Sequence, residues 1–198
     1  MPDATASLQG VVVSQYRLIP LPLEGLARVE HRRHDDARGA FARLYCEDSL
    51  QTQGVPFHVR QINRSLTRQR GSVRGLHYQS GLPAESKYIT CVRGAVWDVV
   101  VDLRRGSPTF LRWHAEQLTA EAGFSLLVPP GFAHGFQTLS DDSELLYLHS
   151  ADHAPDREGG LAHDDPRLAI DWPLPVINLS LRDQQHAWLD NHFSGLNP

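Results

Sequence analysis

The 198-residue sequence has few cysteines and no long apolar run. Its two cysteines, Cys46 and Cys91, are too few for a disulfide framework, and its first ten residues lack the basic and apolar segments of a signal peptide. We therefore expect a cytoplasmic protein. The longest apolar stretch, Ala95–Leu103, is interrupted by Asp98 and Asp102, whereas a membrane-spanning helix needs about 20 apolar residues. Insertion into a membrane is therefore not expected.

The sequence also has no excess of basic residues and almost no lysine. Its 19 basic and 23 acidic residues give a net charge of -4, so the basic surface that nucleic-acid binding requires is not expected. Lys87 is the only lysine among the basic residues. Because a compact ammonium and a planar guanidinium are not interchangeable, Lys87 is a candidate site residue. The alternative is a surface lysine that escaped a general bias toward arginine.

Helix-like periodicity is nearly absent. From position 50 onward, turn signals recur about every 8–12 residues between short alternating or β-branched runs, a pattern typical of a β-sandwich or barrel. The length and the 41% hydrophobic content suit a single core. We expect one all-β domain over residues 1–198.

The clearest strands lie in the middle of the chain. The segment Lys87–Leu103, with the turn pair Arg93-Gly94, predicts a β-hairpin. Strand alternation predicts that three of its apolar residues share one face: Trp97, Val99 and Val101. Further strands are expected at residues 110–118, 124–128 and 144–150.

The two ends of the sequence look different from this middle part. Residues 11–20 and 27–45 predict edge strands around a loop at residues 34–39. Residues 151–175, rich in Asp, Pro and Gly, predict a long ordered loop. A short C-terminal helix is expected to begin at Ser180, with Asp183 as its capping-box partner and Gly195 beyond its end.

Two histidine-containing segments are candidates for chemistry. In the first, strand alternation separates Arg74 and His77 onto opposite faces unless Gly75 forms a bulge. Taken alone, His77 would be interpreted as a structural histidine. In the second, His134 lies between glycines and aromatic residues that suit either a flat ring or a tight turn. Cupin-like metal sites supply a His-x-His pair, but Gln79 stands two residues after His77. We therefore expect no metal.

Seven segments together resemble the dTDP-4-dehydrorhamnose 3,5-epimerase family and its sugar-nucleotide epimerase relatives, from about residue 38 to residue 183. They are, in chain order, RGLHYQ, the segment around Lys87, VDLRRGSPTF, VPPGFAHGF, LLYLHSADHAP, DDPRLAIDWP and LSLRD. The resemblance implies a cupin-type jelly roll with a short C-terminal helical segment, assembled as a homodimer. It also implies cofactor-independent epimerisation at C3, C5 or both of a nucleotide-linked 4-keto-6-deoxyhexose.

The resemblance assigns catalytic roles that suit this chemistry. A ketone at C4 acidifies the protons on C3 and C5, so a base of near-neutral pKa can remove one if the enolate oxygen is stabilised. The implied residues are His77 as base, Asp183 as its carboxylate partner, Lys87 beside the enolate oxygen and Tyr147 as acid on the opposite face. Without the resemblance, Tyr147 would be interpreted as an amphipathic strand residue and Asp183 as a helix cap.

Binding residues follow from the same resemblance. Arginines are expected at the diphosphate and other side chains at the nucleotide and sugar: Arg38 and Arg74, then Gln61, Asn63, His134 and Phe136. The sequence departs from the family pattern at Arg43, where relatives have a glutamate, and at His153, where the 3,5-epimerases have a second tyrosine. His153 makes inversion of a single centre plausible.

Two other classes of function remain open from the sequence. One is a metal-dependent cupin oxygenase or isomerase, and the other is a non-catalytic module that binds a sugar nucleotide. The set of acid, base and cation described above favours the epimerase over both.

Overall fold

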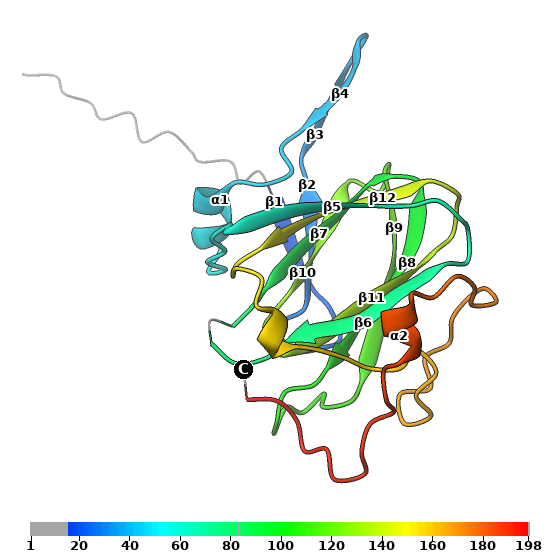
Figure 1. The fold of residues 1–198 in the computed structure, drawn as a ribbon. Helices are drawn as coiled ribbons and strands as arrows, with labels where there is room; N and C mark the ends of the chain where they lie inside the picture. The colour runs from blue at the N-terminus through cyan, green and yellow to red at the C-terminus, as the bar shows by residue number, and fades with distance from the viewer. Residues whose placement is uncertain (1–15, 83, 198) are drawn as a thin grey trace, which may run out of the picture.

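Two antiparallel β-sheets face each other in the computed structural model, which describes residues 16–82 and 84–197 (Figure 1). The larger sheet has the order β1 (Tyr16–Pro20), β2 (Ala27–His31), β10 (Phe124–Val128), β7 (Lys87–Arg93), β12 (Ser143–His149) and β5 (Gln61–Thr67). The smaller sheet has the order β13 (Glu158–Gly160), β6 (Val73–Gln79), β11 (Phe132–Thr138), β8 (Ala95–Asp102) and β9 (Trp113–Thr119). The expected all-β class is confirmed.

The main core lies between the two sheets. The larger sheet contributes Ile89 and Leu126, and the smaller sheet contributes Val96 and Val100. A second apolar cluster covers the outer face of β8 and includes the three residues expected to share a face, Trp97, Val99 and Val101. Because strand side chains alternate between faces, β8 has apolar side chains on both sides. This sheet is therefore buried between the main core and the C-terminal segments.

The expected hairpin at Lys87–Leu103 is wrong. β7 pairs with β10 and β12 in the larger sheet, whereas β8 pairs with β9 and β11 in the smaller one. Both strands and the Arg93-Gly94 turn exist, but the turn takes the chain from one sheet to the other. Both strands place apolar residues, such as Ile89 and Val96, in the core between the sheets. A tight turn in the sequence is compatible with either arrangement.

The other expected strands are largely confirmed, with shifts of a few residues in β9 and β12. The N-terminal loop expected at residues 34–39 is instead a hairpin of β3 (Arg33–Asp36) and β4 (Gly39–Ala42), which projects from the body in Figure 1. Helix α1 (Glu47–Gln51) was not predicted. The loop expected at residues 151–175 contains the 3-10 helix η1 (Pro155–Arg157) and β13. Residues 11–15 of the first expected strand lie outside the described residues.

The C-terminal helix is shorter than expected. α2 covers only Leu181–Gln184, and Ser180 caps it by accepting a hydrogen bond from the Asp183 backbone N–H at 3.0 Å. The helix therefore ends well before Gly195. None of the helices in the described part of the chain is long and apolar enough to span a membrane.

Strand β6 contains the bulge that the Arg74–His77 spacing requires. His77 pairs with His134 and Arg74 pairs with Phe136, so three steps along β6 match two steps along β11. Gly75 in the bulge has φ +112° and lies against the backbone of Gly135. The extra residue turns Arg74 away from the outer face and toward the same side as His77.

We predict that Gly75→Ala lowers the free energy of unfolding by about 3 kcal/mol, because φ is positive and the new Cβ would crowd backbone. That Cβ would lie 2.7 Å from Gly135 Cα and 2.8 Å from the His134 carbonyl oxygen. The control is Gly106→Ala, with φ +74° and no atom within 4 Å of the new Cβ, which should cost about 1 kcal/mol. Urea denaturation measures both, and equal costs would contradict the importance of the close contact.

Candidate active site

A pocket of about 810 Å³ lies between the two sheets. Strands β5, β7 and β12 form one wall, β6 and β11 form the other, and residues 178–183 close one side. Among the described residues, ten of the eleven site residues predicted from the sequence line this pocket, and Arg38 does not: His77, Asp183, Lys87, Tyr147, Arg74, Gln61, Asn63, His134, Phe136 and His153.

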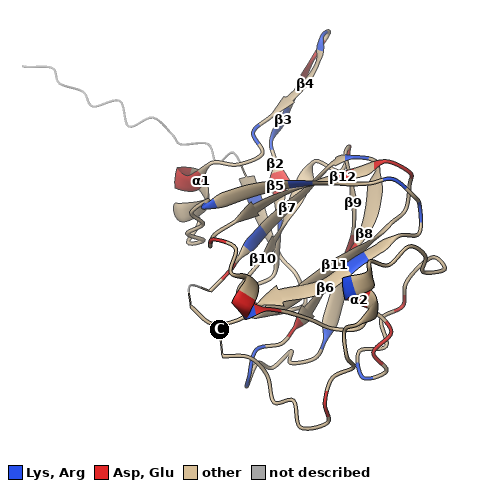
Figure 2. Ribbon diagram, in the orientation of Figure 1, with Lys and Arg blue, Asp and Glu red and all other residues tan. Residues whose placement is uncertain are grey.

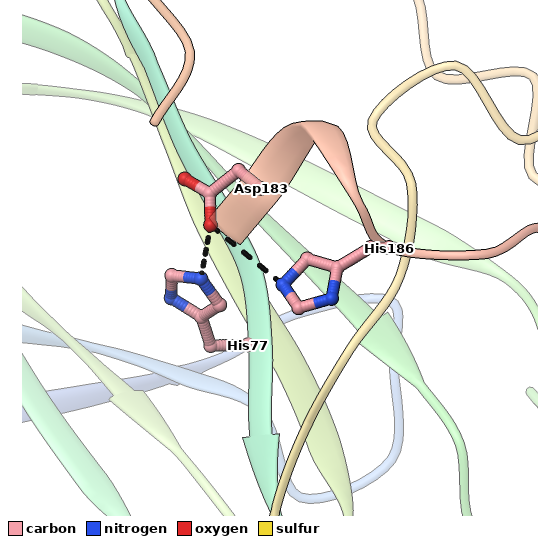
Figure 3. Close-up of side chains that lie close together, drawn as sticks. All are labelled: His77, Asp183 and His186. Atoms are coloured by element: carbon pink, nitrogen blue, oxygen red, sulfur yellow. Dashed lines mark hydrogen bonds and ion pairs between the residues drawn. The ribbon is translucent and has the colours of Figure 1, made fainter. Parts of the chain in front are cut away.

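His77 and Asp183 form a hydrogen-bonded pair, although they are far apart in the sequence. His77 Nε2 lies 2.7 Å from Asp183 Oδ1, as Figure 3 shows, and the Gly75 backbone N–H donates to Asp183 Oδ2 at 3.3 Å. Burial alone would raise the pKa of Asp183, but the hydrogen bond and charge of His77 outweigh it and hold that pKa below its usual value. An ionised Asp183 accepts the Nε2–H of His77, which leaves Nδ1 as the ring nitrogen free to act as a base.

The pair has a neighbour that was missed from the sequence. His186 Nε2 lies 3.7 Å from Asp183 Oδ1, and Figure 3 shows both imidazoles directed toward this oxygen. His77, Asp183 and His186 each place one ligand atom within 4.8 Å of the others, so they could hold a metal ion. A metal there would displace the hydrogen bond between His77 and Asp183. The only signal in the sequence is the spacing of three between Asp183 and His186.

Lys87 belongs to a buried cluster on the opposite wall. Its Nζ lies 2.9 Å from Glu85 Oε2, and His149 Nδ1 lies 2.7 Å from Glu85 Oε1. We call Glu85, Lys87 and His149 the Glu85 cluster. Burial alone would raise the pKa of Glu85, but the hydrogen bonds and charges of His149 and Lys87 outweigh it and lower that pKa to about 2. Sequence reasoning missed both partners: Glu85 is only two residues before Lys87, whereas His149 is brought opposite Lys87 by the pairing of β12 with β7.

Tyr147 lies between two histidines on the pocket side of β12. Its ring is stacked with His149, with centroids 6.0 Å apart, and meets His134 edge-on at 5.8 Å. Burial raises the pKa of Tyr147 well above its usual value of 10, so the phenol keeps its proton. His134 Nε2 is in turn 2.8 Å from the buried carboxylate of Asp98, whose pKa is raised by burial.

The remaining predicted residues lie around the mouth and floor of the pocket. Arg74 donates from Nε to Thr67 Oγ1 at 2.9 Å, which fixes the direction of its guanidinium. The backbone N–H of His153 donates to Gln61 Oε1 at 3.2 Å, and the His153 ring is 3.0 Å from Glu158 Oε1. Phe136 is almost fully buried in the main core and forms part of the pocket floor.

Arg38, expected at the substrate diphosphate, does not line the pocket of its own chain. Its side chain is 90% exposed at the turn of the β3–β4 hairpin and pairs with Asp36 at 2.6 Å. Arg43, just after β4, is also exposed. The hairpin pairs only with itself and projects away from both sheets (Figure 1), so its side chains extend away from the body. Figure 2 shows acidic and basic segments of the ribbon side by side on this hairpin.

A β-sandwich whose pocket holds a histidine hydrogen-bonded to an ionised aspartate, a buried lysine and a protonated phenol defines an acid–base enzyme. A sequence profile of the family described as dTDP-4-dehydrorhamnose 3,5-epimerase matches residues 20–191. The chain belongs to this family, which also includes 3-epimerases. It is an isomerase that epimerises dTDP-linked 4-keto-6-deoxyhexoses in deoxysugar biosynthesis, as expected from the sequence.

Individual relatives cover most of the chain. The chain is 43% identical over 169 residues to dTDP-4-dehydrorhamnose 3-epimerase from Streptomyces niveus, with 85% of this chain and 81% of that protein covered. It is 41% identical over 183 residues to the 3,5-epimerase of Mycobacterium tuberculosis strain CDC 1551 / Oshkosh, with 90% of each covered. The 3,5-epimerase structure from Bacillus anthracis strain Ames has a TM-score of 0.85 at 37% identity, covering 88% of this chain and 99% of that chain. The cupin-type fold is thereby confirmed.

We predict that Glu85 makes the stability of the protein depend on pH below 4.5. Its pKa in the folded protein is about 2, below its usual value of 4.5, so its ion pairs stabilise the fold above pH 4.5 and are lost as the pH falls toward 2. The stability difference between the natural protein and Glu85→Gln should therefore be largest above pH 4.5 and shrink by up to about 3 kcal/mol toward pH 2.

Urea denaturation at a series of pH values measures this difference. The control is Glu121→Gln, because Glu121 is exposed and lies outside the pocket. A stability difference for Glu85→Gln that stays constant between pH 5 and pH 2 would contradict the prediction.

Proposed function

We propose that His77 removes a proton from the carbon next to the substrate ketone. A side chain on the opposite wall of the pocket, Tyr147, then returns a proton to the other face of that carbon. The observation that carries this proposal is the His77–Asp183 pair at 2.7 Å in the same pocket as Lys87 and Tyr147. Asp183 fixes the ring tautomer and stabilises the imidazolium once His77 Nδ1 has taken the proton. The electron pair of the broken C–H bond forms the enolate, whose oxygen becomes negative.

The arrangement of the two walls supports the roles of Lys87 and Tyr147. His77 is on β6 of the smaller sheet, whereas Lys87 and Tyr147 are on β7 and β12 of the larger sheet. A sugar bound between the sheets would have the base on one face and the phenol on the other. The Lys87 ammonium stabilises the enolate oxygen as a point charge, and Tyr147 protonates the carbon from the face opposite His77.

We further propose that the pocket binds the dTDP part of the substrate through residues at its mouth. The related Bacillus anthracis structure contains TDP and PPi. The Arg74 guanidinium is suited to phosphate oxygens, and the polar side chains of Gln61, Asn63 and His134 with the ring of Phe136 would contact the nucleotide and sugar. The cysteines Cys46 and Cys91 are free, which is in line with the expected cytoplasmic location.

We predict that the natural protein incorporates deuterium from heavy water into C3 or C5 of a dTDP-4-keto-6-deoxyhexose, and that His77→Asn abolishes this at every position. Nuclear magnetic resonance of the sugar measures the incorporation. His58→Asn, which removes an exposed histidine paired with Glu47 outside the pocket, should retain full exchange. A folded natural protein that binds the sugar nucleotide without exchange would instead be a non-catalytic binding module.

We also propose that C3 is inverted faster than C5, because His153 stands where the two-centre family has a second tyrosine. His153 lines the pocket and its ring pairs with Glu158 rather than pointing freely at a ligand. An imidazole has a shorter reach and a different donor geometry from a phenol. A loss of about 1.4 kcal/mol at one transition state slows that inversion about tenfold.

Early deuterium incorporation at C3 should therefore exceed that at C5 in the natural protein. In His153→Tyr the amounts incorporated at C3 and at C5 should be more nearly equal. The ratio at short reaction times, followed by nuclear magnetic resonance, is the measurement. His192→Tyr, at an exposed histidine outside the pocket, is the control and should leave the ratio unchanged. Equal incorporation at both carbons of the natural protein would contradict the proposal.

We propose, finally, that the protein is a homodimer in which the β3–β4 hairpin reaches the pocket of the partner. The hairpin projects from the body, and Phe41 on it is 67% exposed, which is unusual for a large apolar side chain without a partner surface. Exchange of hairpins would bring Arg38, expected at the substrate diphosphate, to the pocket of the second subunit. The same contact would cover Phe41.

Mixing two defective variants tests the exchange of hairpins. Arg38→Ala is expected to have low activity at subsaturating substrate, and His77→Asn is expected to have none. In a dimer with one subunit of each kind, one of the two sites combines a natural His77 with a natural Arg38 and is intact. When equal amounts of the two variants reassemble, about half of the dimers contain one subunit of each kind, and each of these has one intact site of two. The mixture should therefore recover about a quarter of the natural activity. Activity no higher than the average of the separate variants would place Arg38 and His77 in sites within one chain. Sedimentation measures the dimer itself.

A further inference from the structure

The wall opposite His77 carries an imidazole that the mechanism above does not use. In the antiparallel register, His149 on β12 lies directly opposite Lys87 on β7 and Gln61 on β5. Tyr147, two residues earlier on β12, has its side chain on the same face because strand side chains alternate. Both rings line the pocket. Tyr147 and His149 are therefore neighbouring proton-bearing groups on the wall opposite the base.

The Glu85 cluster holds His149 in one orientation. The side chains of Glu85, Lys87 and His149 are all nearly buried, with Glu85 9% exposed. The ionised carboxylate accepts from Lys87 Nζ at 2.9 Å with one oxygen and from His149 Nδ1 at 2.7 Å with the other. Because Nδ1 is committed to Glu85, Nε2 is the nitrogen of His149 that exchanges a proton. The pairing repeats, on the other sheet, the arrangement of His77 with Asp183.

The environment of Nε2 suits both protonation states of His149. Asn63 Nδ2 lies 3.3 Å from this nitrogen, so the amide donates to it when the imidazole is neutral. If the amide turns over, its carbonyl oxygen accepts from the Nε2–H of the imidazolium. Lys87 and Glu85 together are neutral, so protonation of His149 leaves the cluster with one positive charge beside the developing enolate.

We propose that His149, oriented by Glu85, is a second acid of the epimerisation and acts from the wall opposite His77. The His149 Nε2–H bond breaks and its proton goes to the substrate carbon, while the enolate electron pair forms the new C–H bond and the C4 carbonyl is restored. Neutral His149 then recovers a proton from water. In the reverse reaction the same nitrogen removes the proton. This inference rests on the proton-transfer mechanism proposed above.

Tyr147 by itself is a weak candidate for the acid, because proton transfer would leave it as a charged phenolate. Once it has given up its proton it is a phenolate, and the buried position of this side chain disfavours a charge. Imidazoles in general exchange protons near neutral pH, where a general acid is most effective. The stacked His149 ring, 6.0 Å from Tyr147, gives the wall a second proton-bearing group beside the phenol.

The test compares deuterium exchange with inversion. His77 can remove a proton, exchange it with heavy water and return deuterium to the same face of the carbon. Exchange therefore needs only the base on one wall, whereas inversion also needs an acid on the opposite wall. His149→Asn should retain exchange at the carbon that loses its proton to His77 but lower the ratio of inversion to exchange by about 10-fold or more. Glu85→Gln, which keeps the shape of the side chain but loses its charge, should lower the ratio in the same direction.

The control is His114→Asn, because His114 forms a similar pair with Glu116 at 2.8 Å but is on β9, outside the pocket. If His149→Asn does not fold, His149→Gln, which retains more of the side-chain volume, takes its place. A ratio equal to that of the natural protein would overturn the assignment of His149 while leaving His77 as the base. Absence of exchange in the natural protein itself would instead refute the proposed mechanism.

Discussion

The site depends on one close backbone contact, where Gly75 in β6 lies against Gly135 in β11. The contact accommodates the bulge that turns Arg74 toward the pocket, and without it Arg74 would share the outer face with Leu76 and Tyr78. It also aims the Gly75 backbone N–H at the carboxylate of Asp183. Only glycine allows both the positive φ and the short distance, so a backbone constraint positions the proposed base, His77, and its partner Asp183.

The C-terminal helix α2 serves mainly to hold one carboxylate. In a full capping box, the acidic side chain would return to the N-terminus of its own helix. Here Ser180 caps the Asp183 backbone, which leaves the Asp183 carboxylate free to bond His77 across the pocket edge. A helix of four residues has little intrinsic stability, so its position is set by these contacts with β6.

Imidazole–carboxylate pairs recur around the pocket, and their surroundings differ. His77 and Asp183 face the pocket on the smaller sheet, and His149 and Glu85 face it on the larger sheet. Asp183 and Glu85 both remain ionised because their partners outweigh the effect of burial. Only Glu85 also binds a lysine, so the two walls differ in charge. A reaction that removes a proton from one face and adds one to the other needs a proton-transferring group on each wall.

The sequence by itself determined the all-β class, most strand positions and the catalytic candidates His77 and Lys87, because alternation, turn residues and motif order are local properties of the chain. The tertiary structure alone decided that β7 and β8 join different sheets, since a tight turn suits a hairpin or a corner equally well. It likewise joined His149 to Glu85, 64 residues apart, because the register between β12 and β7 depends on packing across the whole sandwich. The tertiary structure also decided the place of Arg38. The sequence resemblance assigns Arg38 to the diphosphate, but it lies on a hairpin that projects away from the pocket of its own chain.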